Sequence, residues 1–186
     1  MKTCRVCKHK FFQLRSTQPV CSIECAIILV ERKKKKSAAE ERRATREALE
    51  KIKTHPTLSK EVEQAMNAYV RLRDFADGCI SCSKAFVPGT LGGACDAGHY
   101  RSKGSAAHLR FDVRNVQGQC KHCNSPRGKA GNHVGYRLGL VAKIGLEAVE
   151  ALEADNDPRK YTRENLRAMR DIYRTIRSIA LAKERK

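Results

Sequence analysis

The sequence predicts a small α+β protein that is held together by bound metal more than by one large core. Three observations support this fold class. Only 5% of the 186 residues are aromatic and none is tryptophan, so large core side chains are scarce for this length. Eight of the nine cysteines form four close pairs. Helical periodicity flanks a central stretch rich in glycine, cysteine, histidine and asparagine.

The cysteine pattern predicts zinc and a reducing compartment. The pairs are Cys4/Cys7, Cys21/Cys25, Cys79/Cys82 and Cys120/Cys123. An odd total without a hydrophobic leader argues against a disulfide framework and favours the cytoplasm. Two close pairs can present four thiolates to one tetrahedral ion, so we expect one structural zinc ion in the first four cysteines and another in the last four. For the first four, reduced thiols on a flexible arm are the alternative.

The charge balance predicts a polyanionic partner. With 38 lysines and arginines against 20 acidic residues, the formal net charge is +18. A compact chain of this charge repels itself unless it meets nucleic acid or an anionic membrane surface. The longest apolar run, Cys25–Val30, is far shorter than the roughly 20 residues that span a bilayer. We therefore expect nucleic acid, and no membrane, as the partner.

Composition divides the chain into four segments. They are a zinc knuckle at 1–30, a charged helical arm at 31–56, a central domain with flanking helices at 57–153, and a basic amphipathic helix at 154–186. The arm opens with a basic run whose lysines are candidate DNA contacts, namely Lys33, Lys34, Lys35 and Lys36. A charged linker that touches no DNA fits the same composition.

Apolar periodicity predicts three helices downstream of the arm. The first covers 57–77 with Ser59 as its N-cap. The last has Thr162 as its N-cap and carries arginines opposite its apolar stripe. The middle helix, 134–153, is expected to bury an apolar stripe of Val134, Leu138, Val141, Ile144, Val149 and Leu152.

Residues around the second set of cysteines follow an order that is typical of nucleases. Asp96 and His99 lie close together, Asn115 follows on the returning segment, and Asn124 comes directly after the last cysteine. Four thiolates close the zinc site, so any chemistry would take place beside it. The order resembles the HNH, or ββα-metal, nuclease superfamily. That resemblance implies a small treble-clef ββα-metal domain stapled by zinc and flanked by helices.

Matches over nearly the whole chain resemble the NinG (Rap) recombination proteins of lambdoid phages. Besides the knuckle and the charged arm, they comprise residues 96–101, 109–111, 114–115, 119–120, 123–124, 131–132, 136–137 and 144–145. The resemblance implies a structure-specific endonuclease that cuts branched DNA, such as Holliday junctions and D-loops, in the host-cell cytoplasm. It also implies phage or host recombination proteins as partners.

The chemistry of the central residues suits phosphodiester hydrolysis. His99 is the candidate general base, because a neutral imidazole can activate water near neutral pH. Asp96 and Asn124 offer oxygen ligands to catalytic Mg²⁺ or Mn²⁺, and Asn115 would hold the loop or orient His99. The alternatives are Asp112 or His133 as the metal ligand, a turn cap at Asn115, and a simple helix N-cap at Asn124.

One position departs from the common form of the motif. The acidic ligand usually precedes the catalytic histidine directly, but Gly98 stands there and Asp96 lies three residues upstream. Both offsets have the same parity along a strand, so the acid would keep its facing. We expect a bend at Gly98 to accommodate the difference.

Basic residues near the constellation are candidate DNA contacts, namely Arg101, Arg110, Arg114, Arg127 and Lys129. A homodimer is expected, because a symmetric junction must be cut in two strands. The rival interpretation is a non-catalytic zinc-finger protein that binds nucleic acid. It explains the charge and both cysteine sets, but it leaves the nuclease-like order of the central residues unexplained.

Overall fold

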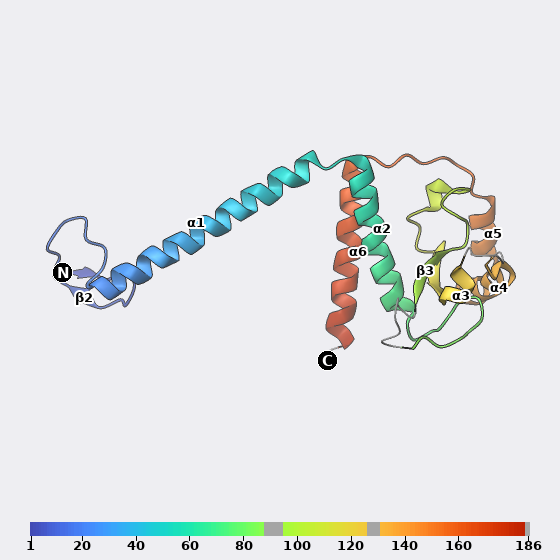
Figure 1. Cartoon of the computed structure of the whole chain (residues 1–186), viewed down its shortest axis with the longest axis horizontal. Coiled ribbons are helices and arrows are strands. Elements are labelled where there is room, and N and C mark those ends of the chain that lie inside the picture. Colours follow the sequence, from blue (N-terminus) through green and yellow to red (C-terminus); the bar gives the residue numbers. More distant parts are fainter. Residues whose placement is uncertain (88–94, 126–130, 185–186) are drawn as a thin grey trace. The chain divides into compact units, whose positions relative to one another are not determined.

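Helices and short antiparallel strands make up two compact units, Met1–Lys53 and Thr54–Lys186 (Figure 1). The computed structural model describes residues 1–87, 95–125 and 131–184, and of Glu184 it describes the backbone alone. Each unit has a two-stranded sheet, which confirms a mixed helix-and-strand architecture. None of the helices in these residues has the length and apolar character that crossing a membrane requires.

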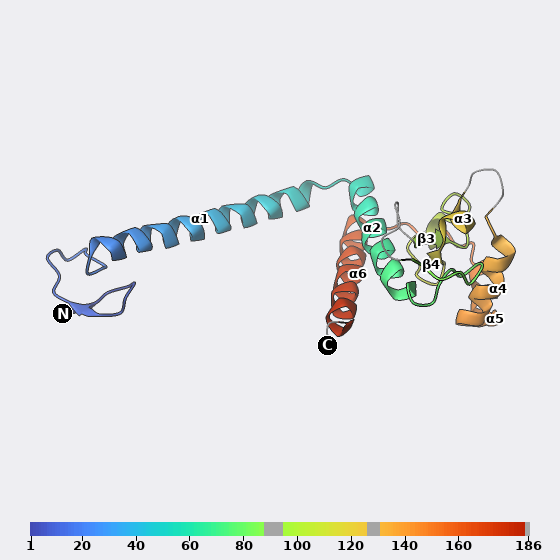
Figure 2. The ribbon, with the colours of Figure 1, turned by 60° about the horizontal axis from the view of Figure 1, so that its bottom comes forward.

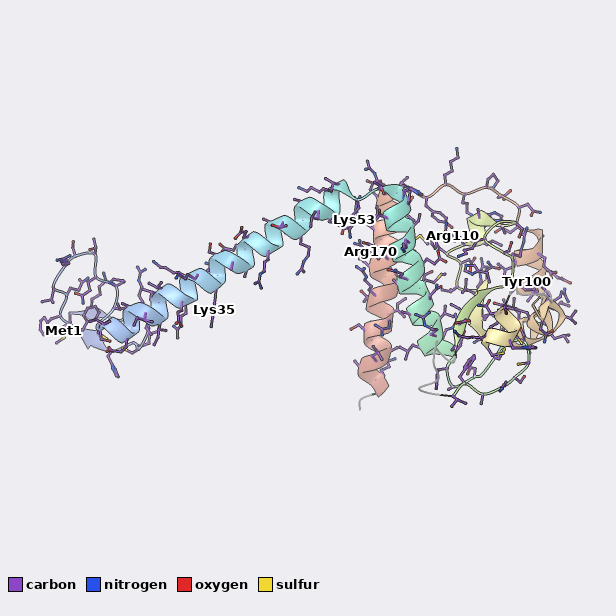
Figure 3. All side chains as sticks on the ribbon, in the orientation of Figure 1. Met1, Lys35, Lys53, Tyr100, Arg110 and Arg170 are labelled. Atoms are coloured by element: carbon purple, nitrogen blue, oxygen red, sulfur yellow. The ribbon has the colours of Figure 1, made fainter. Side chains whose placement is uncertain are left out.

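The first unit is a cysteine knuckle continued by a long helix. Strand β1 (Lys2–Thr3) pairs with β2 (Lys10–Phe11), and Ser22 then caps helix α1 (Ile23–Ile52). Strong helix formers fill α1, and of its residues only Cys25 is buried. Figure 3 shows its side chains standing out all along the helix. The predicted boundary between knuckle and arm thus falls inside one continuous helix.

Two helices far apart in the sequence form the main core of the second unit. Helices α2 (His55–Asp74) and α6 (Arg163–Glu184) lie side by side and run in the same direction (Figures 1 and 2). Their facing sides bury Leu58, Val62, Met66, Val70, Leu166 and Tyr173. The predicted amphipathic character of both helices is confirmed at these positions, and Thr162 accepts a hydrogen bond from the Asn165 N–H at 3.1 Å, as its predicted capping role requires.

The start of α2 differs from the prediction. Thr54 caps the helix by accepting from the Thr57 N–H, and Pro56 lies in the first turn, where a missing N–H costs nothing. The predicted cap, Ser59, is buried within the helix. Proline therefore opens this helix rather than ending the arm.

Two helices, α4 (His133–Ile144) and α5 (Leu146–Ala154), replace the single helix predicted over 134–153. Gly145 separates them with a φ of +87°, a backbone conformation that residues other than glycine rarely adopt.

The buried face of α4 is also wrong in the prediction. Val134 and Leu138 are 75% and 66% exposed. A Cβ at Gly139 would lie 2.0 Å from the Ile80 carbonyl oxygen, and one at Gly135 would lie 2.1 Å from the Ser81 carbonyl oxygen. The helix therefore packs its glycine face against the backbone of Ile80 and Ser81, between Cys79 and Cys82.

A second sheet lies between the α2/α6 pair and helices α4 and α5 (Figures 1 and 2). Strand β3 (Asp96–His99) pairs antiparallel with β4 (Val116–Gln119), so that Asp96 lies opposite Gln119 and His99 opposite Val116. The connection between them contains a 3₁₀ turn, η1 (Ala107–Leu109), and α3 (Lys121–Asn124) follows β4 directly.

A buried ion network ties α2 to β4 and α4. Asp74 is 1% exposed and accepts from Arg73, from Lys143 at 2.7 Å and from the Gly118 N–H at 2.7 Å. Burial raises the pKa of Asp74, but the cations of Arg73 and Lys143 lower it more. Asp74 is therefore held as a carboxylate.

Candidate metal centres and the cleft beside them

Two clusters of four cysteines have the geometry of tetrahedral thiolate sites. Within each cluster the sulfurs lie within 4.8 Å of one another. A zinc ion with Zn–S bonds of about 2.3 Å separates its sulfurs by about 3.8 Å. The measured separations agree, at 3.4 Å for Cys7–Cys21, 3.8 Å for Cys21–Cys25 and 3.9 Å for Cys82–Cys120. The clusters are the predicted sets, Cys4, Cys7, Cys21 and Cys25, and Cys79, Cys82, Cys120 and Cys123.

The backbone around one cysteine of each cluster favours the thiolate. Burial raises the pKa of Cys4, yet backbone hydrogen bonds lower it further, to about 6. The pKa of Cys79 is also below its usual value, because backbone groups of Cys120 and Ser81 outweigh the opposing effect of burial. Thiolates are the form that binds zinc.

Two other cysteines of each cluster, Cys21 and Cys25 in the first and Cys82 and Cys123 in the second, have raised pKa values, because of burial and neighbouring thiols. The arrangement of the sulfurs shows that both clusters could hold a structural zinc ion, and His, Cys, Asp and Glu form no further cluster of this kind in the described ranges.

A cleft of about 480 Å³ opens beside the second cluster. Its walls come from β3, α3, the start of α4 and the segment after β3. The side chains in its wall that carry nitrogen or oxygen are His99, Ser102, Lys103, Gln119, Asn124, Ser125, Asn132, His133 and Tyr136. Two of the four predicted catalytic residues, His99 and Asn124, thus share one cleft.

His99 is oriented as a neutral base. Its Nε2 lies 3.0 Å from the carbonyl oxygen of Arg110. A carbonyl can only accept, so Nε2 carries the ring proton and the lone pair stays on Nδ1. Burial lowers the pKa of His99 below its usual 6.5, partly offset by the Arg110 carbonyl. The imidazole is therefore mostly neutral at pH 7.

The side-chain ends of Asp96 and Asn124 meet. The Asn124 amide nitrogen lies 3.4 Å from Asp96 Oδ2, and rotating the amide would bring its oxygen beside the carboxylate. These are hard oxygen donors of the kind that Mg²⁺ prefers. Asp96 itself is outside the residues that line the cleft.

Gly98 leaves room for a neighbouring side chain and does not bend the strand. It lies in the regular strand β3, so the expected bend is wrong. A Cβ there would lie 1.9 Å from Gln119 Oε1 and 3.1 Å from Asn124 Oδ1. The Gln119 side chain therefore crosses the position where the common motif has its acid, which leaves Asp96 as the acid on that face.

The two alternative metal ligands lie apart from each other. Asp112 forms a two-pronged ion pair with Arg114, at 3.1 Å and 2.7 Å. His133 is exposed at the start of α4, where its ring lies 5.6 Å from the Tyr100 ring, and it lines the cleft.

Asn115 holds the loop behind the cleft. It is fully buried, its Oδ1 accepts from the Arg101 N–H at 2.8 Å, and its amide donates to the carbonyl oxygens of Arg101 and Leu109. These bonds fix the loop whose next residue, Arg110, orients His99. Asn115 therefore holds this loop by its hydrogen bonds and does not line the cleft.

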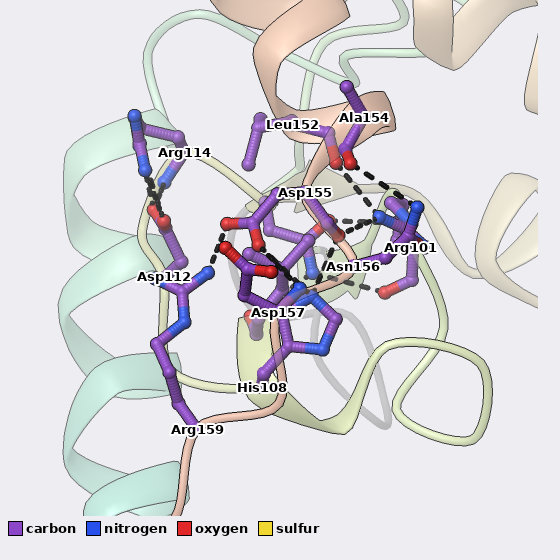
Figure 4. A network of polar contacts seen from close by, with 12 residues as sticks. Arg101, His108, Asp112, Arg114, Leu152, Ala154, Asp155, Asn156, Asp157 and Arg159 are labelled. Atoms are coloured by element: carbon purple, nitrogen blue, oxygen red, sulfur yellow. Dashed lines mark hydrogen bonds and ion pairs between the residues drawn. The ribbon is translucent and has the colours of Figure 1, made fainter.

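The described arginines that were predicted to contact DNA have partners within the chain. Arg101 donates to the Leu152 and Glu153 carbonyls at the end of α5 and to Asn156 Oδ1 (Figure 4). Arg110 pairs with Glu63 at 2.9 Å, and Arg114 pairs with Asp112. Lysines 33–36 are exposed on α1. Arg127 and Lys129 lie outside the described residues.

Some residues of the cleft were not predicted. Tyr136 is buried and donates to the Gly98 carbonyl at 2.9 Å, which fixes β3 against α4. Asn132 caps α4 and also donates to the Ser81 carbonyl at 2.8 Å. Asn132 lies before an apolar run and carries a capping signal, whereas nothing in the sequence distinguishes Tyr136 from a core residue.

Fold and sites together define a small protein of mixed helix and strand with two four-cysteine clusters that could hold zinc. The chain belongs to the NinG family of bacteriophage proteins, because the family model described as "Bacteriophage Lambda NinG protein" matches residues 1–184. Relatives named "Protein ninG" are 44% identical over 115 residues in Escherichia phage 933W and Salmonella phage P22, and 43% identical over 115 residues in Escherichia phage lambda.

These matches cover 61% of the chain. They cover 53% of the 933W and P22 proteins and 52% of the lambda protein, so the matched part of the chain spans about half the length of these relatives. No solved structure matches significantly.

Proposed function

We propose that this chain is a metal-dependent endonuclease of the HNH type, the activity associated with the Rap name, that cuts branched DNA such as Holliday junctions and D-loops in phage recombination. The observation that supports it best is His99, a neutral imidazole fixed by the Arg110 carbonyl in a cleft shared with Asn124. Membership of the NinG family and the net charge of +18 agree with a DNA substrate.

Each residue has a defined task in this proposal. His99 Nδ1 takes a proton from the attacking water, and the Nε2–H bond to Arg110 stabilises the imidazolium that forms. Asp96 and Asn124 would hold Mg²⁺ or Mn²⁺, which when bound offsets charge on the phosphate. Asn115 keeps the loop in place. The products would carry 5′-phosphate and 3′-hydroxyl ends.

The setting of the reaction is part of the proposal. Cuts at related positions in two strands require two centres, so we infer a homodimer on junctions. Phage or host recombination proteins would be partners in the host-cell cytoplasm. The basic run of α1, Lys33 to Lys36, would contact phosphates because it is exposed, and among the described residues its one ion pair joins Lys36 to Glu40 at 3.9 Å.

A gel assay tests this function. Four-way junction, flap and linear duplex are incubated with protein, with and without Mg²⁺. The wild type should cut the branched substrates only with the metal. His99→Ala should bind them and lose cleavage by roughly two to four orders of magnitude. His122→Ala is the matched control, because this exposed histidine lies on α3, outside the residues that line the cleft.

A non-catalytic zinc-finger protein is the second candidate. The exposed, basic first unit favours it, since knuckle and helix α1 have the charge to bind DNA without any cleft. Binding of junctions without nicking in Mg²⁺ or Mn²⁺, with His99→Ala behaving identically, would establish this alternative.

A further inference from the structure

The loop after β2 exposes two large apolar side chains. Phe12 is 75% exposed and Leu14 is 91% exposed. The preceding residue, Phe11, packs against the knuckle core, and strand alternation turns Phe12 to the opposite side. Phe12 is therefore exposed because of the direction in which the backbone points its side chain.

Polar side chains fold back to hold this loop. The Gln13 amide donates to the carbonyl oxygens of Ser16 at 3.3 Å and Gln18 at 2.9 Å. The Leu14 N–H donates to Gln18 Oε1 at 3.0 Å. The loop thus uses its polar groups internally while its apolar groups face water, the reverse of the usual arrangement. Apolar groups presented in this way indicate a binding surface.

The surrounding charge specifies the partner. Before Glu24 the chain has five basic residues and no acidic one, and two of the five, Lys10 and Arg15, flank the apolar pair. An apolar tip between cations suits a polyanion with accessible apolar faces. DNA offers these where its bases are unstacked, and proteins insert Phe or Leu at such steps.

We propose that residues 12–14 form a wedge that packs Phe12 and Leu14 against unstacked bases at a DNA branch point, with Lys10 and Arg15 on the adjacent phosphates. This inference rests on the proposed function, which supplies the branched substrate. It assigns recognition of the branch to the first unit and cleavage to the second.

The test uses a junction with 2-aminopurine at the branch point, a base analogue that fluoresces more strongly when it leaves the stack. Full-length His99→Ala should raise the fluorescence on binding. Adding Phe12→Ala or Leu14→Ala should abolish that rise and weaken junction binding on the order of tenfold, with linear duplex binding unchanged. Ile52→Ala, at a 72% exposed position on α1, is the control and should change neither.

Equal affinity and equal fluorescence for Phe12→Ala and Ile52→Ala would overturn the wedge. Loss of sedimentation with anionic lipid vesicles in Phe12→Ala, with junction binding intact, would overturn it in favour of a membrane contact. Cleavage by the wild type is scored separately, so a failed wedge and a failed nuclease assignment are distinguishable. Two zinc ions per chain in each variant would show that the knuckle is folded.

Discussion

Each of the two clusters consists of four cysteines, but their surroundings differ. In the first unit the buried residues of the knuckle are Cys4, Val20 and Cys25, so the ligands are most of the core. In the second unit the cluster lies beside separate apolar cores on α2/α6 and on α4/α5. The comparison predicts that bound zinc would be essential to the fold of the first unit, whereas in the second it would hold Asn124 at the edge of the cleft.

Removing one ligand from each cluster should produce the largest effects. Cys4→Ser should leave residues 1–22 without defined structure, because structural zinc contributes about 10–16 kcal/mol of apparent folding energy at such sites. Cys123→Ser should disrupt β3, β4 and the cleft while the α2/α6 helices persist. Elemental analysis should give one zinc per chain in each variant, and amide NMR spectra should show which unit is lost. Two zinc ions in Cys4→Ser would break the comparison.

The buried ion network should be the next most costly to remove. Asp74→Asn removes the buried carboxylate that Arg73 and Lys143 share and leaves Lys143 only its exposed partner Asp77. Breaking a buried pair of this kind costs about 3–5 kcal/mol. Denaturant unfolding of the second unit measures this. Asp77→Asn is the control, since Asp77 contacts the same Lys143 but is 59% exposed, and it should cost less than about 1 kcal/mol.

The same network predicts that acid destabilises the second unit. The folded-state pKa of Asp74 is lowered, so its contribution is complete above the unfolded value of about 3.9 and is lost as pH falls through the folded pKa. The free energy of unfolding should therefore fall below about pH 4 in the wild type, and the fall should be shallower in Asp74→Asn. Identical slopes would remove Asp74 from this account.

A smaller effect is expected at Asn115. Asn115→Ala removes the partners of the Arg101 N–H and the Arg101 carbonyl, while the Leu109 carbonyl keeps the Asp112 N–H as a donor, and this loss should cost about 1–3 kcal/mol. Because the loop positions His99, cleavage should fall and its pH midpoint should shift, whereas a purely structural residue would leave the midpoint in place. Binding of junction DNA should be unchanged.

The smallest effect on stability is expected from the basic run of α1. Replacing Lys33 to Lys36 by glutamine should leave unfolding unchanged and weaken DNA binding. The logarithmic salt dependence should flatten by up to about 3.6, since each lost phosphate contact contributes about 0.9. A variant with the wild-type salt dependence would show that this part of α1 is a spacer.

Much of the fold follows from local signals. Paired cysteines identified both clusters, and apolar spacing identified the α2 and α6 faces. The prediction failed where tertiary contacts decide. Gly135 and Gly139 let α4 approach the backbone of residues 80–81. This contact decides which face of α4 is buried and leaves Val134 and Leu138 exposed.

The order of the candidate site residues along the chain could be predicted from the sequence, but the contacts that each of them makes could not. Spacing indicated His99, Asp96, Asn115 and Asn124. It could not show that Asn115 acts through the loop, because this depends on the Arg101 and Leu109 carbonyls. Nor could it show that Arg101 caps α5, since its carbonyl partners lie about fifty residues away in the chain.

Single-turnover cleavage of a four-way junction as a function of pH tests the central claim most directly. With deprotonated His99 as the proposed base, the wild-type rate should rise with pH to a plateau. Its midpoint should lie below 6.5, because burial and the cations Lys103 and Arg110 lower the pKa of His99 more than Glu63 and the Arg110 carbonyl raise it. His99→Ala should lose the activity and the pH step. An unchanged rate and profile in His99→Ala would contradict the account.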